Sequence, residues 1–175
     1  LESRGHEVTI ACVKNAGESQ VLVSGAVVVK SFAWKGDPRY LKSAAMDAWL
    51  RGEMGRFDIV HLHSVWQFPT FAAARACWRT GTPYVVLLNG MLDEYSVDQH
   101  SKWLKRLYWT LREKRIEGRS KGIHFLNQAE IRRAVSWMGG MAKFVIGNGI
   151  SRGELDKLPA RGAFRGAHSE IGDRP

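Results

Sequence analysis

The sequence predicts an α/β domain built on a doubly wound, mostly parallel β-sheet. Short β-branched segments alternate along the chain with helical segments, which is typical of parallel strands joined by helices. The 175 residues are enough for one such domain with a substantial core. Hydrophobic residues make up 45% and charged residues 25% of the chain, a composition that argues against extensive disorder.

Six segments predict strands, because each is rich in β-branched or aromatic residues and is bounded by Gly, Pro or polar residues. The first follows Gly5, which suits a chain that has just left a helix. The second contains Gly25, which marks a bulge or an end. The predicted strands span residues 7–13, 21–29, 57–63, 84–88, 123–126 and 144–146.

Four segments predict helices, because their apolar residues recur at helical spacing. Pro38 lies near the start of the first, and the second is rich in alanine and ends before Gly81. Asn127 predicts the cap of the fourth, with Glu130 as the reciprocal partner of that cap. The predicted helices span residues 40–49, 71–79, 102–119 and 129–138.

The chain divides into a domain over residues 1–150 and a linker over residues 151–175. The linker is predicted because the regular pattern fades after Asn148-Gly149 and the tail is rich in Gly, Arg and Pro. Residues 1–5 resemble the end of a helix with its terminating glycine. We therefore expect a segment upstream of this chain, whose first strand is missing.

The formal net charge of +9 favours anionic partners, such as nucleic acid, phosphorylated molecules or an acidic membrane surface. Two cysteines without metal-ligand spacing, Cys12 and Cys77, predict reduced thiols in a cytosolic protein. No apolar run approaches the ~20 residues that cross a bilayer. The sequence contains neither GxGxxG after a strand nor GxxxxGKS/T, so it does not predict a nicotinamide-binding or P-loop domain.

Two histidines, His61 and His63, lie at the carboxyl end of the third predicted strand and point to one face. A metal pair is one interpretation, but it needs a third ligand, and no suitable cluster stands out. A second interpretation is that both histidines only pack against their neighbours. A third interpretation is a ligand-binding cleft, because ligands of open α/β sheets bind beyond the carboxyl ends of strands. His63, Ser64 and Trp66 lie where that cleft is expected.

Asn89-Gly90-Met91 follows the next predicted strand at the equivalent place. A glycine there lets the backbone approach a ligand, and asparagine tolerates a left-handed turn. A plain turn explains the same residues equally well.

The predicted helix over residues 102–119 is amphipathic. Its apolar stripe is most simply a core face. The basic face also carries a tryptophan, which suits contact with an acidic membrane surface or an anionic lipid. Nucleic acid and a plain solvated face are the alternatives. The predicted core face holds Leu104, Leu107, Tyr108 and Leu111, and the predicted contact face holds Lys102, Lys105, Arg106 and Trp109.

Taken together, ten segments resemble family 4 glycosyltransferases, in the bacterial exopolysaccharide and lipopolysaccharide branch. No single segment is diagnostic, but their order and spacing are fairly specific. The segments are RGHEVTI (4–10), FDIVHLHS (57–64), HLHSVWQFP (61–69), PYVV (83–86), NGMLD (89–93), RLYW (106–109), IHF (123–125), IGNGI (146–150), RGAFR (161–165) and IGDRP (171–175).

The resemblance implies one half of a GT-B fold, in which two Rossmann-like domains face a cleft. The acceptor lies mainly in the first domain and the nucleotide-sugar donor in the second. Transfer then retains the anomeric configuration and needs neither metal nor cofactor. The resemblance makes His63 a candidate catalytic residue. It also implies acceptor contacts at Ser64, Trp66, Asn89, Gly90 and Met91, and an interdomain hinge at Asn148 and Gly149.

Three departures from the family pattern qualify this expectation. The family's first strand and its glycine-rich loop are missing before Leu1. Asn89 stands where many members carry His or Arg, and an amide is neither a general base nor a cation. Gly147 replaces the proline of the hinge, which should loosen it. The donor domain is also absent, so we expect this chain alone to be inactive.

The sequence thus predicts a glycosyltransferase fragment that acts in bacterial surface-polysaccharide synthesis. Its expected partners are a nucleotide sugar and a glycan or lipid-linked acceptor, without nucleic acid. We expect it in the cytoplasm, peripheral on the inner face of the cell membrane. The rival interpretations are a non-catalytic, basic Rossmann-like binding module and a truncated remnant without activity.

Overall fold

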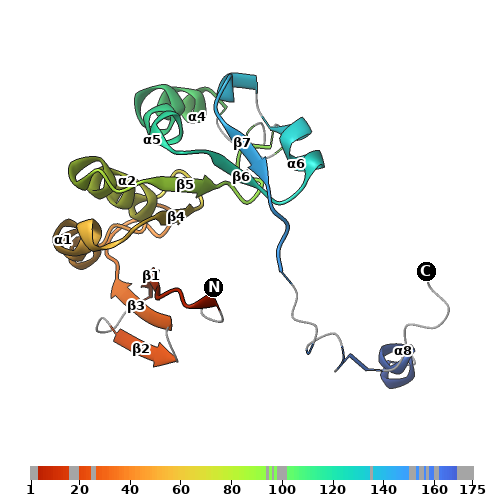
Figure 1. Ribbon diagram of the computed structural model, residues 1–175. Coiled ribbons are helices and arrows are strands. Elements are labelled where there is room, and N and C mark those ends of the chain that lie inside the picture. Colours follow the sequence, from red (N-terminus) through yellow and green to blue (C-terminus); the bar gives the residue numbers. More distant parts are fainter. Residues whose placement is uncertain are drawn as a thin grey trace.

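The computed structural model describes residues 4–15, 20–24, 27–93, 95, 97, 102–134, 136–149, 153, 156, 158–159 and 162–168. The strands form two sheets, and helices flank the larger one (Figure 1). That sheet has the order β4-β5-β6-β7 and is parallel throughout. The predicted α/β fold with a Rossmann-like sheet is therefore confirmed. Its strands are β4 (Val60–His63), β5 (Tyr84–Leu87), β6 (Ile123–Phe125) and β7 (Lys143–Val145).

The smaller sheet has the order β1-β3-β2 and corrects one prediction. The single strand predicted over residues 21–29 is two strands, because β2 ends at Ser24 and β3 begins at Val27. These two strands pair antiparallel, whereas β1 and β3 pair parallel. The strands are β1 (Val8–Lys14), β2 (Gln20–Ser24) and β3 (Val27–Ala33).

Helix α1 (Ala44–Glu53) begins later than the sequence predicted. Pro38 lies in a turn, and Ser43 is the N-cap instead. The Ser43 hydroxyl accepts a hydrogen bond from the backbone N–H of Met46 (3.2 Å) and donates one to the carbonyl of Ala33 (2.7 Å). The first N–H groups of a helix have no partner inside the helix. The hydroxyl of Ser43 can accept one of them, whereas the side chain of Pro38 cannot, and this favours a helix that starts after Ser43.

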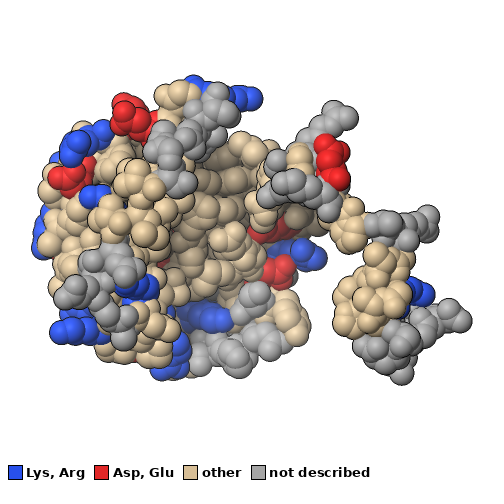
Figure 2. Space-filling model, turned by 90° about the horizontal axis from the view of Figure 1, so that it is seen from below, with Lys and Arg blue, Asp and Glu red and all other residues tan. Residues whose placement is uncertain are grey.

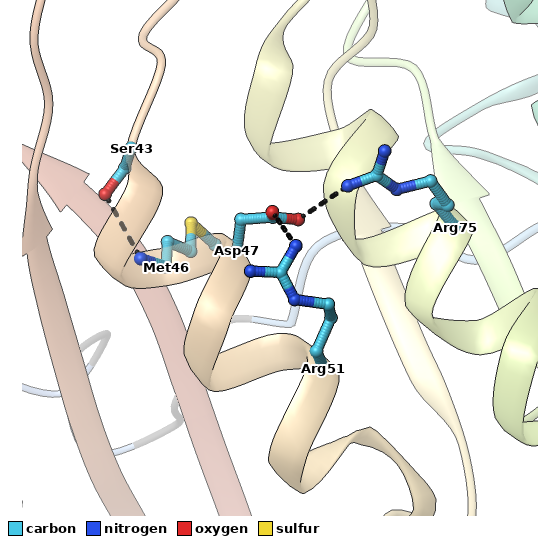
Figure 3. A network of polar contacts seen from close by, with 5 residues as sticks. All are labelled: Ser43, Met46, Asp47, Arg51 and Arg75. Carbon is cyan, nitrogen blue, oxygen red and sulfur yellow. Dashed lines mark hydrogen bonds and ion pairs between the residues drawn. The ribbon is translucent and has the colours of Figure 1, made fainter.

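An ion-pair network joins α1 to α2 (Figure 3). Asp47 of α1 accepts from Arg75 of α2 at 2.9 Å and from Arg51 one turn along α1. Helix α2 ends where Gly81 adopts a left-handed conformation with φ of 77°, as the sequence predicted. Helix α6 is shorter than predicted, and a 3₁₀ turn follows it. The bounds are α2 Phe68–Thr80, α6 Gln128–Arg133 and the turn η4 Ser136–Met138.

The core lies between the larger sheet and the helices α1, α2 and α5. One face of the sheet supplies apolar side chains such as Leu62 and Val86, which are 5% and 0% exposed. Two polar side chains of this layer are hydrogen-bonded, since Trp78 Nε1 donates to the Tyr84 hydroxyl and that hydroxyl donates to the carbonyl of Ile116. This chain of bonds connects α2, β5 and α5.

The predicted helix over residues 102–119 is one helical segment with a π-helical turn in its middle. Single π turns inside α-helices are frequent at functional sites. The part before the turn runs beside the loop that follows β4, because the rings of Tyr108 and Trp66 lie 6.1 Å apart. The three parts are α4 (Lys102–Tyr108), the π turn η3 (Trp109–Glu113) and α5 (Lys114–Arg119).

The predicted orientation of this helix was wrong. Trp109, which we assigned to the exposed basic face, is 3% exposed and belongs to the core. The leucines that we assigned to the core are exposed instead. Trp109 is bulkier than any of them, and burying it removes more apolar surface from water. The exposed apolar residues of the segment are Trp103, Leu104, Leu107 and Leu111.

Within the predicted linker over residues 151–175, the structure describes one short helix, α8 (Ala163–Ala167). None of its residues is buried. Most of the other residues of this stretch lie outside the described part of the chain. The division at residue 150 stays a prediction.

Candidate functional site

Three loops meet at the carboxyl edge of the larger sheet. They follow β4, β5 and β6, and they come together because parallel strands all end at the same edge. Two of them contain the residues singled out from the sequence. The loop after β4 carries Ser64 and Trp66, and the loop after β5 carries Asn89, Gly90 and Met91.

The first two loops hold an unusual backbone. Ser64, Trp66 and Asn89 have φ values of 78°, 70° and 51°, and Gly90 follows with 71°. Left-handed conformations are uncommon for residues other than glycine, and they gather at binding and catalytic sites. Such a backbone persists only where neighbouring groups hold it in place.

Glu130 is one of the groups that hold it. Its side chain is buried, with 8% of the residue exposed. One carboxylate oxygen accepts the backbone N–H of Gly90 and the other that of Leu126, both at 2.7 Å. Glu130 thereby joins the loop after β5 to the loop after β6.

The helix cap at this place was predicted only in part. Asn127 Oδ1 accepts the backbone N–H of Glu130 at 2.9 Å, which confirms the cap. The carboxylate of Glu130, however, bonds Gly90 and Leu126 instead of returning to the cap residue. Reasoning from the sequence missed this contact, since the two residues are 40 positions apart.

Two adjoining pockets open between the loops, and both are lined by Asn89 and Gly90. We call them together the edge groove. Their volumes are ≈ 320 and ≈ 190 Å³, which suits a sugar unit better than a large cofactor. The larger is lined by Asn89, Gly90, Asp93, Leu126, Asn127, Glu130 and Arg133, and the smaller by Trp66, Asn89, Gly90, Met91 and Lys105.

The structure brings five sequence-predicted residues together around the smaller pocket. Four are the expected acceptor contacts, and the fifth is Lys105, which was expected on the helix surface. Ser64 is not among the lining residues. Its hydroxyl donates to the sulfur of Met91 at 3.1 Å and so connects the loops after β4 and β5. The side chain of Lys102 lies outside the described residues.

His63 is not among the residues that line the edge groove. Its ring lies 4.5 Å from that of His61, on the face of the sheet opposite Leu62. Partial burial, together with the nearby His124, lowers the pKa of His63 below its ordinary value. This environment favours the neutral form of the side chain.

His61 and His124 continue the row of histidines. His124 Nε2 donates to the carbonyl of Ile146 at 2.7 Å, because a carbonyl oxygen only accepts. In the neutral ring Nδ1 then accepts from Nε2 of His61 at 3.2 Å. Partial burial and the neighbouring histidines lower the pKa of His61 to about 4. Within the described part of the chain, no three His, Cys, Asp or Glu side chains could share a metal ion.

The remaining predicted residues lie away from the groove. Arg106 is exposed on α4, whereas the buried Trp109 cannot reach a membrane. Asn148 and Gly149 follow β7 without regular structure, and both are exposed. Their position suits a hinge, and the hinge itself stays a prediction.

The model of the glycosyl transferase 4-like domain matches residues 1–149. The chain belongs to this family. It is therefore a glycosyltransferase domain, and the match covers every strand of both sheets and all the loops of the edge groove. No curated protein matches the chain closely enough to be counted as a relative. None of the helices in the described residues is long and apolar enough to cross a bilayer.

Proposed function

We propose that this glycosyl transferase 4-like domain binds the sugar acceptor in the edge groove. The enzyme transfers a sugar from a nucleotide sugar to a glycan or lipid-linked acceptor in bacterial surface-polysaccharide synthesis. The observation that carries the proposal is the groove itself. It lies at the carboxyl edge of a parallel sheet, where ligands of such folds bind, in a chain of the glycosyltransferase family.

The lining residues suit an acceptor sugar. The indole of Trp66 offers an apolar surface for the C–H face of a sugar ring, and the amide of Asn89 both donates and accepts hydrogen bonds. Gly90 lets a ligand approach the backbone. Lys105 brings a positive charge to the same pocket, which suits the phosphate of a lipid-linked acceptor.

The donor and the chemical step are proposed on the family resemblance. The nucleotide sugar binds a second domain, reached through the hinge at Asn148 and Gly149, and transfer retains the anomeric configuration without a metal or cofactor. The same resemblance, rather than the lining of the edge groove, makes the imidazole of His63 the candidate to orient or polarise the acceptor hydroxyl. The chain then works as part of a longer enzyme.

The test is a transfer assay on the protein expressed from its full open reading frame. A panel of radiolabelled nucleotide sugars serves as donors, and an organic extract of bacterial membranes serves as the acceptor source. We expect labelled sugar to appear in the lipid fraction. If no donor of the panel labels the lipid fraction, the proposed function is rejected. His63→Ala tests the catalytic assignment, which falls if turnover is unchanged.

Trp66→Ala is expected to raise KM for the acceptor by roughly tenfold, the equivalent of about 1.4 kcal/mol, while KM for the donor is unchanged. The reason is the loss of the aromatic surface on one side of the smaller pocket. Trp78→Phe is the matched control, because Trp78 lies on α2 and bonds Tyr84 instead of lining the groove. Equal acceptor KM in both variants would remove Trp66 from the site.

We also propose that the exposed face of α4 and η3 docks on an acidic membrane surface at the cytoplasmic side, which makes the protein peripheral. The corrected orientation of the helix supports this. Trp103 and Leu111 are 72% and 68% exposed, and the basic residue Arg106 is exposed beside them. Apolar side chains that enter the interface next to basic ones are typical of helices that lie on membranes.

The double variant Leu107→Glu/Leu111→Glu is expected to abolish co-sedimentation with phosphatidylcholine–phosphatidylglycerol vesicles at low salt. Pure phosphatidylcholine vesicles should bind the wild type weakly, since each basic residue near an acidic surface contributes about 1 kcal/mol. Leu22→Glu is the control, because Leu22 is an equally exposed leucine on β2.

A parallel binding experiment with DNA tests nucleic acid as the rival partner. Comparable, salt-sensitive binding of the wild type to a random DNA duplex would favour a basic binding module instead. In the view of Figure 2 the Lys and Arg side chains lie around the rim of the main body, and uncharged residues fill its hollowed centre. This face therefore carries no continuous basic surface among the described residues.

A further inference from the structure

The two pockets of the edge groove differ in charge. The larger is lined by the carboxylates of Asp93 and Glu130 and by the guanidinium of Arg133. Lys105 is the charged residue of the smaller pocket. The formal charge of the lining side chains is therefore negative in the larger pocket and positive in the smaller one. A phosphate is attracted to the smaller pocket, whereas a neutral ligand rich in hydroxyl groups suits the larger.

The polar side chains of the larger pocket are already held in place. Asp93 Oδ1 accepts the backbone N–H of Tyr95, and Asp93 Oδ2 forms an ion pair with Nε of Arg133, both at 3.0 Å. The carboxylate of Glu130 accepts two backbone N–H groups. A carboxylate has about four acceptor positions, and these contacts use two of them in each case. Both carboxylates therefore keep the capacity to accept hydroxyl groups of a ligand.

Helix α6 and the loop after β5 form the walls of this pocket. Glu130 and Arg133 are three positions apart and therefore lie on one face of α6. The loop is joined to this helix at two places, since Glu130 bonds Gly90 and a β-bridge pairs Asp93 with Ala134. A pocket whose walls are fixed before binding loses little conformational freedom when a ligand enters.

The ion pair of Asp93 and Arg133 is poorly explained by stability alone. The side chain of Arg133 is 64% exposed, and ion pairs with such an exposed partner contribute little to folding. The side chain of Asp93 is only 19% exposed. An open guanidinium that is oriented by a more buried carboxylate is well placed to donate hydrogen bonds to a ligand.

The sizes of the two pockets indicate that one ligand spans both. The smaller measures ≈ 190 Å³ and the larger ≈ 320 Å³, and both are lined by Asn89 and Gly90. Small-molecule sites usually measure about 300–1,000 Å³, so the smaller pocket alone is below this range. A ligand that continues past Asn89 and Gly90 occupies a site of ordinary size.

We propose that the larger pocket is a second sugar subsite, in which Asp93 and Arg133 bind the hydroxyl groups of a further sugar unit of the acceptor. The acceptor then carries at least two sugar units, with its phosphate beside Lys105 and its outer unit in the larger pocket. This inference rests on the proposed function. The transferred sugar of the donor has the same hydroxyl chemistry, and the experiment separates these two sources.

The first measurement is the size of the product in the transfer assay on the full-length protein. Mild acid releases the labelled glycan from the lipid phosphate, and chromatography gives its number of sugar units. We expect three units or more, because two come from the acceptor and one from the donor. A labelled disaccharide as the main product would show an acceptor of one unit and overturn the inference.

The second measurement compares KM for acceptor and donor in variants of the larger pocket. Arg133→Ala removes the guanidinium, and Asp93→Asn removes the charge but keeps an oxygen for the N–H of Tyr95. Arg56→Ala is the matched control, because Arg56 also forms an ion pair with a carboxylate, that of Glu53, and does not line the groove. The melting temperature of each variant checks that the fold is retained.

We expect Arg133→Ala and Asp93→Asn to raise acceptor KM by about tenfold or more, with kcat and donor KM unchanged. Arg56→Ala should match the wild type. A rise in donor KM instead would assign the larger pocket to the transferred sugar and overturn the inference, as would unchanged acceptor KM in both variants. If the wild type labels no acceptor at all, the proposed function fails and this inference fails with it. A disaccharide product or unchanged acceptor KM rejects the second subsite alone.

Discussion

Glu130→Leu is expected to lower the free energy of unfolding by about 3 kcal/mol or more, measured by urea denaturation. The substitution removes the only charged acceptor described for two backbone donors, Gly90 and Leu126, each bonded at 2.7 Å. A buried donor left without a partner costs about 1–3 kcal/mol. The substitution leaves two such donors, the N–H groups of Gly90 and Leu126, without this acceptor. The loops after β5 and β6 should also separate, so that the edge groove widens.

Glu53→Leu is the control for this loss. Glu53 forms an ion pair with Arg56 at 2.6 Å, but its side chain is 35% exposed and the Arg56 side chain 77%. Exposed ion pairs contribute about 0–1 kcal/mol, so this variant should unfold close to the wild type. Similar losses in the two variants would show that the carboxylate of Glu130 does not bind the loops together.

Glu117→Gln is expected to remove much of the pH dependence of stability above neutral pH. Burial raises the pKa of Glu117 to about 9, and the neighbouring Glu113 adds to the rise. Its ordinary value is 4.5, so between the two values the folded state keeps a proton that the unfolded state has lost. The free energy of unfolding therefore falls as pH rises through this range, by up to about 1.4 kcal/mol per pH unit.

The measurement is the melting temperature of both proteins at several pH values between about 6 and 9. The neutral amide of Glu117→Gln does not titrate, so its melting temperature should fall less steeply than that of the wild type. Part of the slope near pH 7 should remain, because burial also raises the pKa of Glu113 to about 7. Glu53→Gln should follow the wild-type slope. Parallel curves for Glu117→Gln and the wild type would contradict the prediction.

The sequence predicted the parts of the fold that depend on local pattern. β4, β5 and α2 come from continuous apolar or alanine-rich segments with clear ends, and the structure places them close to the predicted bounds. The edge groove was predictable in outline, because the residues after parallel strands meet at one edge. Trp66 and Asn89 were singled out on that ground, and both line the groove.

The remainder depends on contacts between distant residues. Glu130 joins two loops by accepting the backbone N–H of Gly90, which is 40 positions away, and this contact leaves no local trace in the sequence. The orientation of the helix over residues 102–119 was misjudged for a related reason. Both of its faces carry apolar residues, and periodicity alone does not tell which face the rest of the protein covers. The burial of Trp109 identifies the covered face of this helix.

The row of histidines also fixes the backbone that follows β7. The N–H of Ile146 donates to the carbonyl of Phe125 at 3.0 Å, and its own carbonyl is held by His124 at 2.7 Å. Both polar groups of the Ile146 backbone are thus hydrogen-bonded to residues of β6. The sheet therefore holds the chain up to Ile146, and Gly147 is the next residue along the chain.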